Sequence, residues 1–229
     1  MMKSILPLVL IFLSFLTLQA EASKTVRLFI LSGQSNAGGN GNGDELKQSQ
    51  KELDPEVLLA FNSGQFMTMA PIKKKKVKFK IQNSIFGTEL SFSKKLKQAY
   101  PNDIIAICKV GIRGGTSIVA WGKDRTRPGW KEELKALGIE EASQRMLYQE
   151  IIDGVNKGIE NLKKRKDVKE VIISGMWWCQ TERDSSFVEF SKAYEKNLTN
   201  FINNLRQDFN TPRLPFLFFD QHIILLWGV

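Results

Sequence analysis

Histidine and cysteine are scarce in this sequence of 229 residues, which contains one histidine and two cysteines. A single histidine excludes a metal site built from several imidazoles, and two cysteines exclude a four-cysteine zinc site. Two cysteines also exclude a disulfide-dense scaffold. Cys108 and Cys179 lie near the ends of apolar runs, so they are expected to be buried free thiols; the alternative is a disulfide between them in an exported protein. No metal site is predicted, and any catalytic imidazole of this sequence is His222.

Long hydrophobic runs are also absent, except for one at the start of the sequence, at residues 5–18. Lys3 precedes this run, and Ala20-Glu21-Ala22 follows it as a cleavage signature. The pattern predicts a signal peptide over residues 1–22 and a secreted protein, either extracellular or periplasmic. Because the run is too short for a comfortable membrane span, we expect no stable membrane anchor after cleavage.

The sequence has an excess of positive charge, with a formal net charge of +9. Much of it lies in the run KKKKVKFK at residues 73–80. We interpret this run as a solvated loop or strand edge; the alternative is a patch that binds acidic polysaccharide or nucleic acid. No nucleic-acid partner is expected, because neither interleaved aromatic residues nor a nucleic-acid-binding motif accompanies the run.

The rest of the sequence has an ordinary globular composition, 42% hydrophobic and 25% charged. Short apolar runs alternate with segments of helical periodicity, which predicts one α/β domain over residues 23–229 with a parallel sheet covered on both faces. The predicted strands are residues 25–31, 103–110, 168–176 and 214–219, and residues 57–61 form a further apolar segment. The predicted helices are residues 44–51, 88–100, 141–163 and 187–205.

Polar or glycine-rich sequence follows three of the predicted strands, at residues 32–36, 111–117 and 179–182. Since the carboxyl ends of parallel strands share one edge of a sheet, these segments are expected to form a site there.

Several motifs are excluded at the first of these loops. Gly33 and Gly38 have the spacing of a phosphate-binding loop, but Gly39-Asn40 replaces its Lys-Ser. The glycines do not fit a dinucleotide fingerprint, and Ala37 breaks the G-x-S-x-G pattern of a nucleophile elbow. No cofactor is therefore predicted, and what remains is a serine at the mouth of the first strand.

Four segments carry a resemblance to a known family. The first, LFILSGQSNAGGNG at residues 28–41, resembles the first block of the SGNH hydrolases, and more narrowly the G-Q-S-N block of the sialate O-acetylesterase and acetylxylan esterase branch. Three later segments are similar to further blocks of that branch, in the same order. They are FGTELSF at residues 86–92, KVGIRGGTSI at 109–118 with Trp121, and WCQTERD at 178–184.

The resemblance implies a three-layer α/β/α sandwich with a mainly parallel, flavodoxin-like sheet. It also implies a secreted serine esterase that removes O-acetyl groups from oligo- or polysaccharides through an acyl-enzyme on Ser35. The implied oxyanion donors are the amides of Ser35 and Gly115, with Gly114 as the near alternative, and the side chain of Gln180. Asn36 and Glu182 are the implied supporting residues.

Each of these residues also has a structural interpretation. Ser35 is a possible helix cap, and Gln180 is a possible partner for loop backbone. At the level of the whole protein, the alternative to an enzyme is a non-catalytic carbohydrate-binding protein that retains the cleft.

The sequence departs from the family at its end, where the family has a D-x-x-H block that supplies the histidine base and its aspartate. Asp220-Gln221-His222 has one residue too few and directly follows the last predicted strand. We therefore do not expect His222 and Asp220 to be the catalytic pair. The expected explanation is a truncated or frame-shifted form of a longer esterase that lacks the last strand and helix and has weak activity or none.

Overall fold

The computed structural model describes residues 23–62, 64–73, 84–124, 129–137 and 146–218. The predicted signal peptide, most of the basic run and both Asp220 and His222 lie outside these ranges. Within them, no helix has the length and apolar character needed to cross a membrane.

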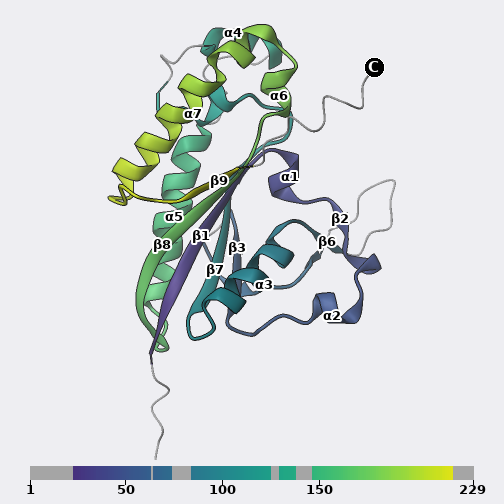
Figure 1. Cartoon of the computed structure of the whole chain (residues 1–229), viewed down its shortest axis with the longest axis vertical. Helices are drawn as coiled ribbons and strands as arrows, with labels where there is room; N and C mark the ends of the chain where they lie inside the picture. The colour runs from purple at the N-terminus through teal and green to yellow at the C-terminus, as the bar shows by residue number, and fades with distance from the viewer. Residues whose placement is uncertain (1–22, 63, 74–83, 125–128, 138–145, 219–229) are drawn as a thin grey trace, which may run out of the picture.

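The centre of the fold is a six-stranded sheet with the strand order β4-β3-β7-β1-β8-β9 (Figure 1). All neighbouring strands are parallel except β3 and β4. This confirms the predicted α/β class with a mainly parallel sheet. The strands are β1 (Lys24–Gly33), β3 (Val57–Phe61), β4 (Met67–Thr68), β7 (Ile104–Ile112), β8 (Val168–Cys179) and β9 (Phe216–Phe218).

The strand order corrects one detail of the expectation. A flavodoxin-like sheet places its first strand between the second and the third, whereas here β7 lies between β1 and β3. Lys109 of β7 accordingly pairs with Leu31 of β1 on one side and with Phe61 of β3 on the other. The connection from β1 to β3 spans residues 34–56 and is long enough to pass over one strand position.

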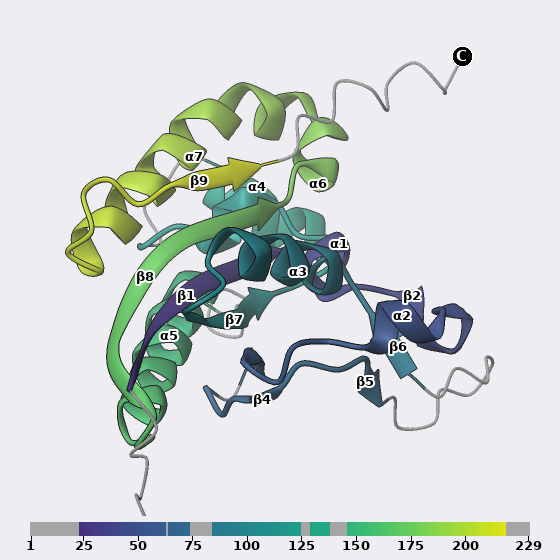
Figure 2. The ribbon, with the colours of Figure 1, turned by 60° about the horizontal axis from the view of Figure 1, so that its bottom comes forward.

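Helices cover both faces of the sheet (Figures 1 and 2). On one face, Leu28 and Ile30 of β1 pack in a core with Tyr148 and Phe201 from two long helices, α5 (Leu147–Lys163) and α7 (Val188–Asp208). The alternate residues of β1 point to the other face, as strand geometry requires, where they join the core beneath α3 (Glu89–Ala99).

Shorter elements complete the described chain. The helices are α1 (Ser35–Gly38), η1 (Gly43–Glu45), α2 (Gln48–Lys51), η2 (Ile118–Trp121), α4 (Trp130–Leu137) and α6 (Glu182–Ser185). A small separate sheet has the order β2-β6-β5. Its strands are β2 (Gly41–Asn42), β5 (Ile72–Lys73) and β6 (Ser84–Phe86).

The two cysteines are buried and free, as predicted. Cys108 belongs to the core on the α5 side of the sheet and Cys179 to the core on the α3 side. A disulfide between them is therefore excluded by their placement on opposite faces. Burial raises the pKa of each thiol to about 12, so both remain protonated at neutral pH.

Candidate active site at the carboxyl end of the sheet

Ser35 is the first residue of α1 and follows β1 by one residue. The helix cap is Gln34, and its side chain makes no cap hydrogen bond, so Ser35 does not have the capping role that the sequence allowed. The Ser35 side chain is exposed, and among the described residues its hydroxyl has no hydrogen-bond partner. The hydroxyl is therefore available to a substrate.

The three loops predicted to converge do meet around this serine. A Cβ atom placed on Gly114, in the loop after β7, would lie 3.8 Å from the Cβ atom of Ser35. From the loop after β8, Glu182 accepts a hydrogen bond of 2.6 Å from the side-chain amide of Asn36, the neighbour of Ser35. The carboxyl ends of β1, β7 and β8 thus form one site (Figure 1).

Gln34 links these loops through its buried side chain, which is 3% exposed. With its amide group assigned in the orientation that satisfies its neighbours, its Oε1 atom accepts from the amides of Gly115 at 3.2 Å and Thr116 at 3.3 Å, and its Nε2 atom donates to Glu182 Oε2 at 2.7 Å. The sequence interpretation assigned no role to Gln34, although it lies within the G-Q-S-N segment. The structure makes it the cross-link between all three loops.

Gln180 is also buried, and its amide group faces other protein groups. Its Nε2 atom donates to the carbonyl of Thr116 at 3.2 Å and to Asp184 Oδ2. Because an amide nitrogen carries only two hydrogens, none is left for a substrate in this arrangement.

The amides of Ser35 and Gly114 have no partner among the described residues. The Gly115 amide is occupied by Gln34. Of the two glycines considered from the sequence, Gly114 is therefore the one whose amide has no partner among the described residues, and its Cα position lies next to Ser35.

Asp184 is the centre of a buried network that the sequence analysis did not assign. It accepts from the Ser117 hydroxyl at 2.8 Å and the Ile118 amide at 2.9 Å, in addition to Gln180. Burial raises the pKa of Asp184 above its usual value, and the hydrogen bonds from Gln180, Ser117 and Ile118 oppose this rise. The network fixes the loop after β8 against η2.

A second buried carboxylate, that of Glu133 on α4, accepts from the Ser117 amide at 2.9 Å. Its other oxygen has no partner among the described groups. Burial raises the pKa of Glu133, while the Ser117 hydrogen bond and the charges of Arg183 and Arg113 oppose the rise. Two carboxylates with raised pKa values thus support the loops around Ser35.

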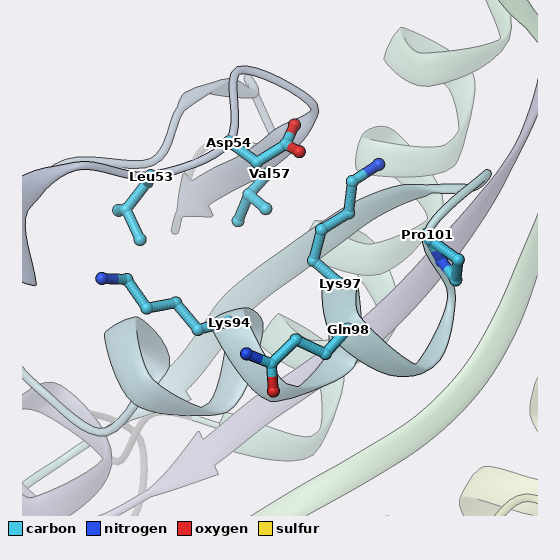
Figure 3. Close-up of a pocket in the computed structure, with 7 residues that line it drawn as sticks. All are labelled: Leu53, Asp54, Val57, Lys94, Lys97, Gln98 and Pro101. Carbon is cyan, nitrogen blue, oxygen red and sulfur yellow. The ribbon is translucent and has the colours of Figure 1, made fainter.

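A cavity of about 300 Å³ lies away from this site, at the opposite end of the sheet (Figure 3). Its walls come from α3 and from the segment that leads into β3. Lys97 Nζ is engaged with Glu56 at 2.7 Å and Lys94 Nζ with the Ser49 carbonyl at 2.7 Å. The lining residues are Leu53, Asp54, Val57, Lys94, Lys97, Gln98 and Pro101.

No group of three or more histidine, cysteine, aspartate or glutamate side chains in the described part of the chain is arranged to hold a metal ion.

Comparison with protein families gives one match that spans most of the chain. The profile of the family described as "Carbohydrate esterase, sialic acid-specific acetylesterase" matches residues 25–222. The chain belongs to this carbohydrate esterase family. The match includes all four segments that carry the resemblance, and it confirms the family predicted from the sequence.

Individual carbohydrate esterases share low sequence identity with this chain. A probable carbohydrate esterase from Arabidopsis thaliana is 25% identical over 202 residues, which cover 83% of this chain and 67% of that protein.

Three solved structures share the fold at 17–20% identity. A protein of Arabidopsis thaliana aligns with a TM-score of 0.59 over 86% of this chain and 73% of its own. NanS aligns with a TM-score of 0.54 over 86% and 68%, respectively. A carbohydrate acetylesterase from Xanthomonas citri aligns with a TM-score of 0.52 over 84% and 40%.

Proposed function

We propose that this carbohydrate esterase removes O-acetyl groups from oligo- or polysaccharides, with Ser35 as the nucleophile. The observation that carries the proposal is the exposed hydroxyl of Ser35, which has no hydrogen-bond partner among the described residues and lies next to Gly114. The amides of Ser35 and Gly114 likewise have no partner among those residues. The description of the matching family supports an acetylated carbohydrate as the substrate.

In the proposed reaction, Ser35 Oγ attacks the acetyl carbonyl carbon, and the negative charge that develops on the carbonyl oxygen faces the amides of Ser35 and Gly114. One such donor contributes about 3–4 kcal/mol to transition-state stabilisation. The bond between the acetyl carbon and the sugar oxygen then breaks, and the sugar oxygen leaves as a hydroxyl with the proton that Ser35 lost. The acetyl group stays on Ser35 Oγ. Water then hydrolyses this ester, which releases acetate and restores the serine.

In this proposal Gln34, Asn36 and Glu182 hold the loops rather than contact the reacting atoms. Gln180, inferred from the family as an oxyanion donor, takes a supporting role because both of its amide hydrogens are used within the protein. Glu182 keeps the orienting role inferred from the resemblance, since its oxygens accept from Asn36 and Gln34.

The proton acceptor for Ser35 is not a histidine of the described residues, because the single histidine, His222, lies outside them. Loss of the base in a serine triad slows the reaction by roughly 10⁴- to 10⁶-fold. Because Asp220-Gln221-His222 is one residue short of the family's D-x-x-H block, we expect this protein to turn over slowly. The same departure from D-x-x-H favours the second candidate function, a non-catalytic protein that binds acetylated carbohydrate in this cleft.

Acetate release separates the two functions. The protein is incubated with acetylated xylo-oligosaccharide and with O-acetylated sialic acid, and acetate is followed by NMR. The control is Ser91→Ala, because Ser91 is an exposed serine on α3 whose hydroxyl bonds only to the Thr88 carbonyl.

The esterase predicts acetate release that Ser35→Ala abolishes and Ser91→Ala retains. Binding without release, measured by calorimetry on the same sugars, favours the carbohydrate-binding protein. Equal release by Ser35→Ala and the parent protein contradicts the proposed nucleophile.

We also propose that the protein acts outside the cytoplasm. The support is the sequence of residues 1–22, with its basic start, apolar run and Ala20-Glu21-Ala22. Expression in a secreting host followed by N-terminal sequencing tests this. A mature protein that begins at Ser23 is expected, and an uncleaved protein that stays in the cell contradicts it.

A further inference from the structure

A fully buried ion pair lies next to α1, the helix that begins with Ser35. Lys109 Nζ of β7 lies 2.9 Å from Glu89 Oε2 of α3, and the two side chains are 0% and 2% exposed. Other ion pairs of the described chain are more exposed to solvent; the side chains of Lys97 and Glu56, for example, are 12% and 29% exposed. None of the proposed catalytic steps uses the buried pair.

The pair is bonded directly to the helix of the nucleophile. Lys109 Nζ donates to the carbonyl of Gly38, the last residue of α1, at 2.8 Å. On the other side, Glu89 Oε1 accepts from the Gly87 amide at 2.8 Å. Gly39 lies against Gly87 so closely that a Cβ atom on Gly39 would be 2.5 Å from the Gly87 Cα atom. The pair therefore connects α1 to β7 and to the start of α3.

Helix α1 has few other anchors. It is four residues long, it lacks a side-chain cap, and Ala37 is its one buried residue. A single helical turn is not stable by itself. The direction in which α1 presents Ser35 therefore depends on contacts from outside the helix. Asn36 bonds to Glu182 near its amino end, and Lys109 bonds to the Gly38 carbonyl at its carboxyl end.

Stability alone does not account for such a pair. Removing two charges from water costs about as much as their attraction returns, and apolar residues of similar volume are often equally stabilising in such a place. Burial lowers the pKa of Lys109, and the charge of Glu89 opposes this. A geometric role explains the pair better, because a lysine can donate to the Gly38 carbonyl and an apolar side chain cannot.

We propose that Lys109 and Glu89 are positioning residues: Lys109 holds the carboxyl end of α1 through the Gly38 carbonyl, and Glu89 holds Lys109, so that Ser35 stays aligned with the Gly114 amide. This inference rests on the proposed role of Ser35 and adds the residues that fix its position.

The test compares two variants that differ in the donor to Gly38. The double variant Glu89→Gln/Lys109→Met removes both charges and the donor, whereas Glu89→Gln alone leaves the lysine nitrogen, charged or neutral, as a donor. The control is Lys97→Gln, in an ion pair at the other end of the sheet. Each protein is assayed for p-nitrophenol release from p-nitrophenyl acetate and for amide exchange of Gly38 and Gly39, with thermal unfolding as a check on folding.

We expect the double variant to lose about 100-fold in kcat with KM unchanged, because a misplaced nucleophile slows the chemical step rather than binding. Exchange of the Gly38 and Gly39 amides, which bond to Gln34 and Ser35 carbonyls, should be at least about tenfold faster. Glu89→Gln weakens the hold on Lys109 but keeps the donor to Gly38, so its losses should be smaller than those of the double variant in both measurements. Lys97→Gln should remain close to the parent protein.

Parent-like kcat and exchange in the double variant would overturn the inference. So would equal losses in Glu89→Gln and the double variant, because the donor to Gly38 would then be irrelevant. If the parent protein shows no Ser35-dependent release at all, the proposed function fails. Exchange at Gly38 and Gly39 still decides whether Lys109 holds α1.

Discussion

The two ends of the central sheet differ in how their polar groups are used. At the amino end, the cavity beside α3 is lined by lysines whose nitrogens are engaged by Glu56 and by the Ser49 carbonyl. At the carboxyl end, the Ser35 hydroxyl and the amides of Ser35 and Gly114 have no partner among the described residues. The presence of a cavity therefore does not identify the candidate active site. What identifies it is a hydroxyl and amides that have no partner within the described part of the protein.

The supporting groups differ in burial as well. Asp184 is 2% exposed and Glu133 0%, whereas the Glu56 side chain at the amino end is 29% exposed. A carboxylate in water is stabilised with or without a partner, but a buried one depends on its hydrogen bonds. Substitutions at the carboxyl end should accordingly have larger effects.

The largest difference is expected between Asp184→Ala and Glu56→Ala. The first leaves the buried Ser117 hydroxyl, Ile118 amide and Gln180 amide without an acceptor, which costs about 3 kcal/mol or more in total. The second removes partly exposed ion pairs and costs about 1 kcal/mol or less. Urea denaturation of both variants measures this, and equal losses would remove the contrast between the two ends.

A smaller difference is expected between two glycines of the site loops, both at positive φ. Gly115 has φ +69° and open space around its Cα atom, so Gly115→Ala should cost about 1–2 kcal/mol of backbone strain. Gly39 has φ +80° and touches Gly87, so Gly39→Ala should cost about 1–3 kcal/mol more through overpacking. Thermal unfolding of both variants tests the close contact between Gly39 and Gly87. Equal losses of stability in the two variants would contradict that contact.

Much of the fold could be predicted because its central strands are short apolar runs. The runs at residues 25–31 and 103–110 correspond closely to β1 and β7, and the helical pattern at 187–205 corresponds to α7. The small sheet was missed, since Gly41 and Asn42 of β2 resemble a loop. The position of β7 between β3 and β1 was not predicted, because a residue pattern does not encode which strand lies beside which.

The site shows the same limit at the level of single contacts. The position of Ser35 after a buried strand was readable from the sequence. The pairing of Lys109 with Glu89, twenty residues apart on different elements, and the use of the Gln180 amide within the protein were not. Both depend on side-chain directions that only the packed structure fixes.

The two ends of the sheet should also differ in how pH affects stability, because the pKa of Glu133 is raised and that of Glu56 is lowered. The folded-state pKa of Glu133 is raised above its ordinary value of 4.5. Its contribution to stability is therefore fully present below that value and is lost as the pH rises through the folded-state pKa. Glu133→Gln retains an acceptor for the Ser117 amide and does not titrate.

Relative to the parent protein, Glu133→Gln should thus gain stability as the pH is raised from below 4.5 to 7. Urea denaturation at several pH values measures the difference, and the difference cancels carboxylates with lowered pKa such as Glu56. A difference that does not change with pH would show that Glu133 is not affected by its burial.

The smallest effect is expected at the amino-end cavity. The double variant Lys94→Gln/Lys97→Gln removes the two cations that line it, and stability should fall by about 1 kcal/mol or less. Release of p-nitrophenol from p-nitrophenyl acetate should be unchanged. A clear loss of that activity would make the cavity, rather than the Ser35 loops, part of the functional site.

If the Ser35 hydroxyl is the nucleophile, the reaction passes through a covalent acetyl-enzyme on that residue. The protein is mixed with p-nitrophenyl acetate, quenched in acid, digested and mapped by mass spectrometry. We expect an acetyl group on Ser35 that Ser35→Ala lacks, even when turnover is slow. An unmodified Ser35 in a protein that releases acetate would contradict it.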